Sequence, residues 1–303
     1  MGRNDSLSIS FPRKVHFQII IIHSYSLFKN KVLVGLYIGV FAKSTLSGRL
    51  LDLRDAKVKA GFETGLGGKF GNKGAVLIRY QIKIYKFLSF EIENTSFCIA
   101  NMHLASGLHK VEERLSQMKE IYEKGFLCNP ETKLKECIIE NHNIVFLVGD
   151  LNFRIPIENA NCRNLIEQNF LSEIICEDQL IKLLKTHPLV SKFREAAITF
   201  APTYKYNKKS NDYDTSKKKR IPAYCDRIIY SDSRNNLKEN FINCRCYNRA
   251  EITNSDHKPV YAIYEIIIET IEEDKKFDLE EEIYSTYLKK STSIILKFFI
   301  FPS

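Results

Sequence analysis

The order of the apolar segments constrains the fold of this chain more than any other feature of the sequence. Segments rich in Val, Ile, Leu, Phe and Tyr are typical of buried strands, and several follow one another here without a helical segment between them. A doubly wound parallel sheet needs a helix after almost every strand, so this order favours two packed sheets flanked by helices. The predicted strands cover residues 31–41, 75–83, 96–103, 143–148, 199–207, 224–230 and 260–268.

Two segments predict helices instead. In residues 108–125 the apolar side chains of Val111, Leu115 and Met118 share one face and charged side chains the other, as in an amphipathic helix. Residues 162–184 are expected to form one or two helices, and the five glycines of residues 65–74 predict a tight loop. We expect one domain over residues 31–269, preceded by a poorly patterned segment (1–30) and followed by a helical or loosely attached tail (270–303).

The charge balance favours an anionic partner. Lys and Arg number 45 against 36 Asp and Glu, so the formal net charge is +9. A phosphate-rich ligand, an acidic membrane leaflet or nucleic acid would suit this surplus, and so would a Lys-rich solvated surface with no partner. The eight cysteines are scattered without a C-x-x-C pair, which predicts a reducing, cytosolic compartment. The longest apolar stretches are too short to span a bilayer, so we expect any membrane contact to be peripheral.

Three predicted strand ends carry residues suited to hydrolysis. Asp150 and Asn152 end one strand and point to the same side, while Asp226 and the pair Asp256 and His257 precede two others. A carboxylate base with neighbouring Asp, Asn and His side chains is what a metal-assisted hydrolase gathers at one sheet edge. The alternative is that Asp and Asn occur at strand ends because they favour turns. His103, at a further strand end, is by itself more typical of a hydrogen-bonded core histidine.

Several short segments follow one another in a recognisable order. Residues 101–106 (NMHLAS), 149–155 (GDLNFRI) and 222–228 (PAYCDRI) are similar to three motifs of one enzyme family, the inositol polyphosphate 5-phosphatases, with Tyr224 in place of the family's Trp. The tyrosine keeps an aromatic body with a polar edge, so we expect the exchange to be tolerated. The other matching segments are 71–76 (GNKGAV), 202–206 (PTYKY), 213–216 (YDTS), 218–220 (KKR) and 255–260 (SDHKPV).

The resemblance implies a fold and a set of catalytic roles. The fold would be a DNase I-like α/β four-layer sandwich of two mostly antiparallel sheets flanked by helices, N-terminally incomplete, with the site at one edge. Asp150 would deprotonate the attacking water, and Asn152 would position water and phosphate. His257, oriented by Asp226, would stabilise charge on the scissile phosphate. Asp256 would lie near a Mg²⁺ ion and help to place the nucleophile, and His103 would contact the phosphate.

The resemblance also implies how a substrate is selected. Four residues correspond to those with which the family holds the 4-phosphate next to the scissile group: Tyr204, Lys205, Lys218 and Arg220. Lysine offers a point charge and arginine a bidentate fork, and both suit a phosphomonoester. Asn72 and Lys73 would meet the 1-phosphate or the loop around it. The expected partners are a phosphoinositide lipid or a soluble inositol phosphate, and the surface of an acidic membrane.

The sequence departs from the family at its principal metal ligand. Family members carry a Mg²⁺-binding Glu on an early strand, whereas the first Glu here is Glu63, inside the glycine-rich region. The metal ligands therefore stay unassigned, with Asp256 as a candidate. An incomplete or misplaced N-terminus would explain this departure, and so would a shortened domain that binds phosphoinositide without hydrolysing it.

Three functions are therefore compared. The first is a Mg²⁺-dependent 5-phosphatase, cytoplasmic and peripheral at the cytosolic face of membranes. The second is a phosphoinositide-binding pseudo-phosphatase that uses Lys205, Lys218 and Arg220. The third is a nuclease of the same superfamily, which the net charge of +9 allows. The PTYKY and KKR segments resemble inositol phosphate-binding motifs, so no nucleic acid is expected as substrate.

Overall fold

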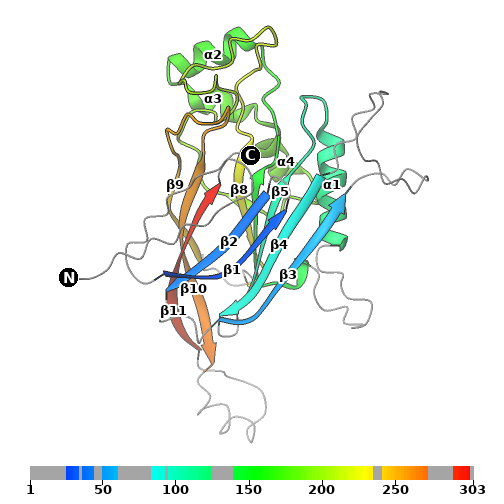
Figure 1. The fold of residues 1–303 in the computed structure, drawn as a ribbon, viewed down its shortest axis with the longest axis vertical. Helices are drawn as coiled ribbons and strands as arrows, with labels where there is room; N and C mark the ends of the chain where they lie inside the picture. The colour runs from blue at the N-terminus through cyan, green and yellow to red at the C-terminus, as the bar shows by residue number, and fades with distance from the viewer. Residues whose placement is uncertain are drawn as a thin grey trace, which may run out of the picture.

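The computed structural model describes residues 25–33, 36–43, 50–60, 83–92, 95–124, 139–234, 241–271 and 289–300. Within these residues, one large sheet forms the centre of the molecule (Figure 1). Its six strands lie in the order β3-β4-β5-β6-β8-β7, and every neighbouring pair is antiparallel except β5 with β6. The strands are β3 (Leu50–Ala60), β4 (Lys83–Ile92), β5 (Thr95–His103), β6 (Ile144–Asp150), β7 (Arg194–Glu195) and β8 (Asp226–Asp232).

Alternate residues of the central strands face two separate cores. In β5, Phe97 and Ile99 belong to one buried cluster, whereas Cys98 and Ala100 belong to another. This division follows from the two-residue period of a strand, which sends successive side chains to opposite faces. Both faces of β5 and β6 are covered, so these strands are apolar throughout rather than alternating.

A second sheet packs on one of these faces. It has three antiparallel strands in the order β11-β10-β9, namely β9 (Ile242–Arg249), β10 (Val260–Ile271) and β11 (Lys289–Ile300). Ala262, Tyr264 and Ile266 of β10 point into the core that contains Phe146 of β6, whose ring centroid lies 5.2 Å from that of Tyr264. A separate hairpin pairs β1 (Tyr25–Leu33) with β2 (Leu36–Lys43).

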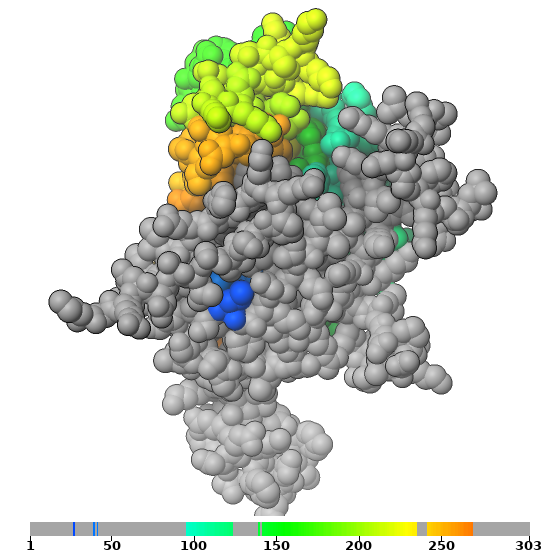
Figure 2. Space-filling model, viewed as in Figure 1, coloured from blue at the N-terminus to red at the C-terminus, as the bar shows by residue number. Residues whose placement is uncertain are grey.

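The described helices cover the other face and one end of the sandwich. Leu115 and Met118 of α1 (Val111–Lys124) and Leu180 of α4 (Gln179–Thr186) are buried against the second face of the six-stranded sheet. The short helices α2 (Asn159–Glu167) and α3 (Leu171–Cys176) lie at one end (Figure 1), and η2 (Ile139–Asn141) precedes β6. Figure 2 shows the segment that contains these two helices gathered at this end, beside β9 and β10. No described helix is long and apolar enough to cross a membrane.

These observations confirm the predicted α/β sandwich of two mostly antiparallel sheets, and they correct several of its elements. Residues 31–41 are not one strand, because β1 ends at Leu33 and pairs there with Leu36, the first residue of β2. Residues 162–184 belong to three helices, interrupted near Asn169, whose φ is 61°. Residues 199–207 form only isolated bridges at Tyr204 and Tyr206, because they pair with loops rather than with a neighbouring strand.

The C-terminal tail also differs from the expectation. Instead of a helix, residues 289–300 form β11, which pairs with β10 from Val260↔Ile300 to Ile271↔Lys289. Residues 294–300 are apolar except for Lys297, and a short apolar run of this kind does not by itself distinguish a strand from a helix. The predicted strand at 75–83 lies outside the described residues, except for Lys83 at the start of β4.

Candidate active site

Three adjacent strands of the six-stranded sheet bring their polar ends together at one edge. Because β5 and β6 are parallel, both end there, and His103 lies in register with Asp150. The antiparallel strand β8 starts at the same edge, with Asp226 in register with Asp150. His103 Nε2 lies 3.3 Å from Asp150 Oδ2. The sheet topology therefore gathers His103, Asp150 and Asp226 at one place.

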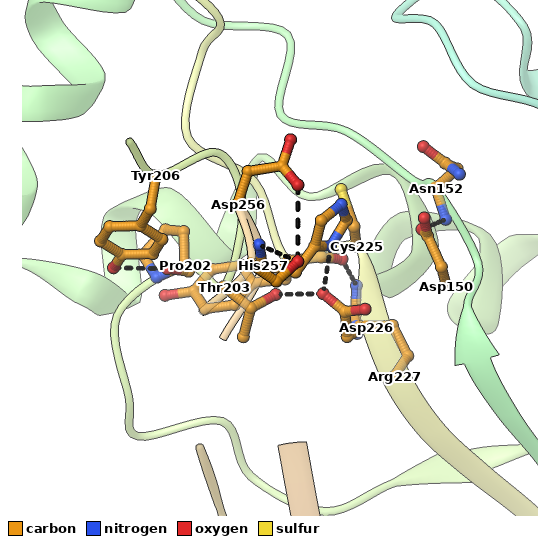
Figure 3. A network of polar contacts seen from close by, with 12 residues as sticks. Asp150, Asn152, Pro202, Thr203, Tyr206, Cys225, Asp226, Arg227, Asp256 and His257 are labelled. Atoms are coloured by element: carbon orange, nitrogen blue, oxygen red, sulfur yellow. Dashed lines mark hydrogen bonds and ion pairs between the residues drawn. The ribbon is translucent and has the colours of Figure 1, made fainter. Parts of the chain in front are cut away.

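A loop beside this edge adds His257. His257 Nδ1 lies 2.9 Å from Asp226 Oδ2, and the hydroxyl of Thr203 donates a hydrogen bond of 2.8 Å to the same oxygen (Figure 3). The backbone holds the two loops together, since the amide of Lys258 donates to the carbonyl of Thr203 at 2.8 Å. Asp226 and Thr203 are buried, whereas the side chain of His257 is 12% exposed. Asp226 thus fixes the orientation of the His257 ring.

Asp150 and Asn152 form the second half of the cluster. Asn152 has φ of 56°, and this turn lets its amide donate a 3.0 Å hydrogen bond back to Asp150 Oδ1. Asparagine tolerates this left-handed backbone better than most residues. The side chain of Asn152 donates through Nδ2 to the carbonyl of Leu104 at 3.1 Å and accepts through Oδ1 from Arg154. A carboxamide nitrogen carries two hydrogens, so one is left to reach a bound ligand.

The charges of this cluster perturb the pKa values of its members. Burial raises the pKa of Asp150, and the nearby carboxylate of Asp226 raises it further. Burial alone would lower the pKa of His257, but the carboxylates of Asp226, Asp150 and Asp256 outweigh it and raise this pKa to about 9. His257 is therefore a cation at neutral pH, beside an acid whose pKa lies closer to neutrality than usual.

The residues expected to bind substrate fall into two groups. Tyr204 and Lys205 lie at the cluster: the ring centroid of Tyr204 is 4.6 Å from that of His257, and Lys205 Nζ lies 3.2 Å from Asp256 Oδ2. Lys218 and Arg220 lie on an exposed loop whose backbone is held by Asp214, which accepts from the amide of Arg220 at 2.9 Å. Asn72 and Lys73 lie outside the described residues.

The described residues supply only part of a metal site. The carboxylate of Asp256 is 27% exposed, so a cation from solvent has access to it. One of its oxygens is already hydrogen-bonded to Lys205. His257 and Lys205 hold the pKa of Asp256 below its usual value although burial opposes them. However, no group of three or more His, Cys, Asp or Glu side chains in the described part of the chain is arranged to hold an ion. This donor set is incomplete for a divalent ion, which prefers six or more oxygens.

Two residues of this cluster were missed in the sequence. Thr203 shares an oxygen of Asp226 with His257, and the guanidinium of Arg154 lies 4.3 Å from the ring centroid of Tyr204 while it binds Asn152. Both lie inside segments singled out for other residues, PTYKY and GDLNFRI. Their place inside these two segments is the only sequence signal for them, because a single threonine or arginine does not by itself indicate a functional site.

Comparisons with known proteins agree with this geometry. Residues 13–263 match the family described as endonuclease/exonuclease/phosphatase family 2. A probable inositol polyphosphate 5-phosphatase of Schizosaccharomyces pombe is 37% identical over 243 residues, which are 76% of this chain and 19% of the relative. The polyphosphatidylinositol phosphatase INP53 of Saccharomyces cerevisiae is 33% identical over 266 residues, 87% of this chain and 22% of the relative. The chain thus spans about a fifth of the length of these relatives.

A solved structure gives the same result. The inositol polyphosphate 5-phosphatase domain of SPsynaptojanin, in complex with inositol (1,4)-bisphosphate and a calcium ion, is similar with a TM-score of 0.70 and 30% identity. The similarity covers 85% of this chain and 67% of that one. This chain therefore belongs to endonuclease/exonuclease/phosphatase family 2 and is homologous to the inositol polyphosphate 5-phosphatase domains within it.

Proposed function

We propose that this chain is a Mg²⁺-dependent phosphomonoesterase that removes the 5-phosphate of phosphoinositides such as phosphatidylinositol 4,5-bisphosphate, or of soluble inositol polyphosphates. The observation that carries the proposal is the 2.9 Å contact between His257 and Asp226, which begins the strand next to that of Asp150. The names of the relatives support the same class of reaction. The bisphosphate bound in the similar structure supports a phosphorylated inositol ring as the ligand.

Asp150 is the general base of this proposal. A carboxylate accepts a proton from water more readily when its pKa is raised toward the working pH, and burial raises the pKa of Asp150. The backbone amide of Asn152 donates to Oδ1 at 3.0 Å and His103 Nε2 lies 3.3 Å from Oδ2, so both neighbours orient the carboxylate that is proposed to accept the proton. In the in-line step the oxygen of that water bonds to phosphorus, its proton passes to Asp150, and the bond to the inositol oxygen breaks.

His257 and its neighbours stabilise the charge that develops. Protonated His257 offers Nε2–H to a phosphate oxygen while Asp226 holds Nδ1, and Asn152 offers its second Nδ2 hydrogen. We propose that His103 contacts the same phosphate. Mg²⁺, when bound near Asp256, would neutralise charge on the phosphate and on the leaving oxygen. The leaving group would take its proton from solvent or from His257.

Substrate selection is proposed to rest on the basic residues. Tyr204 and Lys205 lie beside His257 and would reach the 4-phosphate next to the scissile group. Lys218 and Arg220, on an exposed loop, would close on it from outside. The net charge of +9 suits an acidic lipid surface, so we propose a cytoplasmic protein in peripheral contact with membranes.

The test is phosphate release from a short-chain phosphatidylinositol 4,5-bisphosphate with Mg²⁺ and with EDTA. The parent chain should release phosphate only with Mg²⁺, and Asp150→Ala and His257→Ala should each lose nearly all of this activity. The matched control is Glu173→Ala, which removes an exposed carboxylate of α3 and should keep full activity. Release that survives in both site variants would refute the mechanism.

A second candidate is a binding protein that does not hydrolyse its ligand. It is favoured by the incomplete donor set of the described residues. Tight binding of the head group without release, weakened by Lys218→Glu, would support it. Mg²⁺-dependent release would exclude it.

A further inference from the structure

The start of helix α4 is hydrogen-bonded to residues close in sequence to each of the three strand ends that build the candidate site. Its N-cap residue Asp178 and its first residue Gln179 follow α3 directly in the chain. Both lie in the predicted helical segment 162–184, and neither lies in a segment that resembles a family motif. Together they form hydrogen bonds with Leu108 in the segment that follows β5, with Arg154 in the segment that follows β6, and with Arg227, the second residue of β8.

Gln179 joins the segments that follow His103 and Asp150. Its Oε1 accepts from Arg154 N at 3.0 Å and from Arg114 Nη2 at 2.8 Å, and its Nε2 donates to the carbonyl of Leu108 at 2.9 Å. Its own amide donates to the carbonyl of Arg154 at 3.0 Å. Both lone pairs of the side-chain oxygen are therefore used, and one residue fixes the loop after β6 against the loop after β5.

Arg114 extends this network to the residues next to His103. Its guanidinium is fully buried and donates to the carbonyls of Ala105 and Gly107 at 2.9 and 2.7 Å. The Nε of Arg114 has no hydrogen-bond partner among the described residues, so loss of the acceptor at Nη2 would leave a second unsatisfied donor on this buried guanidinium, which is costly. Gln179 therefore holds Arg114, and Arg114 holds the loop that begins directly after His103.

Asp178 fixes the helix start to the third strand. One of its oxygens accepts from the amide of Ile181 at 3.0 Å and from Arg227 Nη1 at 2.8 Å. Arg227 directly follows Asp226 in β8, and its other side is paired with Glu195 of β7 at 2.8 Å through Nε. All three side chains of this ion network are 0–1% exposed. The start of α4 is therefore attached to the strand that carries Asp226, and this attachment fixes the position of Gln179 relative to that strand.

We infer that Gln179 is a positioning residue for the proposed reaction, setting the separation between the His103 loop and the Asp150–Asn152 turn. It forms no hydrogen bond with the residues proposed to bind the 4-phosphate and reaches Tyr204 only through Arg154, so its loss should lower kcat by a larger factor than it raises KM. Misplacing reacting groups by about 1 Å can cost on the order of a hundredfold in rate. This inference rests on the proposed function, whereas its effect on the two loops can be measured without any turnover.

The variants are Gln179→Leu, which removes the three side-chain hydrogen bonds, and Gln179→Glu, which keeps an oxygen for Arg114 and for the amide of Arg154. The control is Leu184→Ala, one turn further along α4, which removes apolar packing but none of these bonds. The activity readout is the split between kcat and KM on short-chain phosphatidylinositol 4,5-bisphosphate with Mg²⁺. We expect Gln179→Leu to lose roughly ten- to a hundredfold in kcat, and Gln179→Glu to lose less.

The second readout is amide hydrogen exchange of the full chain without ligand. The amide of Leu104 donates to Asp150 O at 2.9 Å and that of Leu151 to Cys225 O at 2.8 Å, so both report on the junctions between the strand ends. Both amides should exchange faster in Gln179→Leu than in Leu184→Ala when the two variants are compared at the same temperature difference from their own Tm. If Gln179→Leu does not fold, Gln179→Glu is compared with the control in the same way.

The outcomes separate the two proposals. A parent chain without phosphate release refutes the proposed function, and the inference is then decided by the exchange data alone. Unchanged exchange at Leu104 and Leu151 would overturn the inference. It would also be overturned if Leu184→Ala lost as much kcat as Gln179→Leu at the same Tm, because stability alone would then explain the loss.

Discussion

The charge of His257 leads to a measurable change in stability with pH. In the native state the pKa of His257 is raised from 6.5 to about 9, because Asp226 and its acidic neighbours outweigh the effect of burial. The side chain is only 12% exposed, so solvent screens these interactions weakly. One pKa unit corresponds to about 1.4 kcal/mol, so the whole shift is worth roughly 3 kcal/mol.

The sign follows from which state holds the proton more tightly. Below pH 6.5 both the native and the unfolded chain carry a protonated His257, and the full stabilisation is present. Between pH 6.5 and about 9 only the native state keeps the proton, so the free energy of unfolding falls as the pH rises. This contribution is lost above the native pKa.

The assay is urea unfolding in EDTA at pH values from 6 to 10, for the parent chain and for His257→Asn. Asparagine can still donate to Asp226 but does not titrate, so subtracting its unfolding free energy removes the contributions of all other groups. The difference should shrink by about 3 kcal/mol across this range. A difference that stays constant with pH would show that His257 is not protonated in the native state, and the electrostatic account of the site would be wrong.

Three further changes follow from the same geometry. Thr203→Val should lower kcat about tenfold, because Asp226 loses the hydrogen bond that the threonine hydroxyl donates. Thr203→Ser keeps a hydroxyl and should retain most of the rate, so equal rates in the two variants would contradict this prediction. Gly149→Ala should destabilise the chain by about 3 kcal/mol or more in urea unfolding, because a Cβ there would lie 2.3 Å from the carbonyl oxygen of Met102, at a φ of +117°. Arg227→Met should cost about 3–5 kcal/mol in the same assay, since it leaves Asp178 and Glu195 buried without their cation; a loss below about 1 kcal/mol would argue against an ionised network.

The central strands and their ends could be predicted from the sequence for a local reason. Residues 96–103 and 143–148 are apolar on both faces, so the pattern identifies buried strands without any knowledge of their partners. Asp150 and Asp226 stand where apolar runs meet polar residues, and the structure places them in register at one edge. Their proximity depends on the antiparallel pairing of β6 with β8, and that of His103 on the parallel pairing of β5 with β6, neither of which the apolar pattern alone specifies.

The remaining features depend on contacts between distant segments. Thr203 and Asp226 are 23 residues apart, and Gln179 and Leu108 are 71 apart, so neither pair leaves a local signal. The strand β11 was missed for the same reason, because its assignment rests on pairing with β10 across a charged segment. Local pattern therefore predicts where functional side chains stand, whereas the residues that hold them are found only in the structure.

The charge balance of the described site gives a physical reason to expect that the proposed reaction requires a further cation. Its three carboxyl groups, Asp150, Asp226 and Asp256, are opposed by Arg154, Lys205 and protonated His257. A phosphomonoester dianion would therefore enter a site that is already close to neutral, and its two charges would be partly desolvated without full compensation. Lys218 and Arg220 are exposed, so their attraction is weakened by water and salt. A divalent ion beside Asp256 would act inside the site, where screening is weaker, and this is the physical reason to expect the reaction to require one.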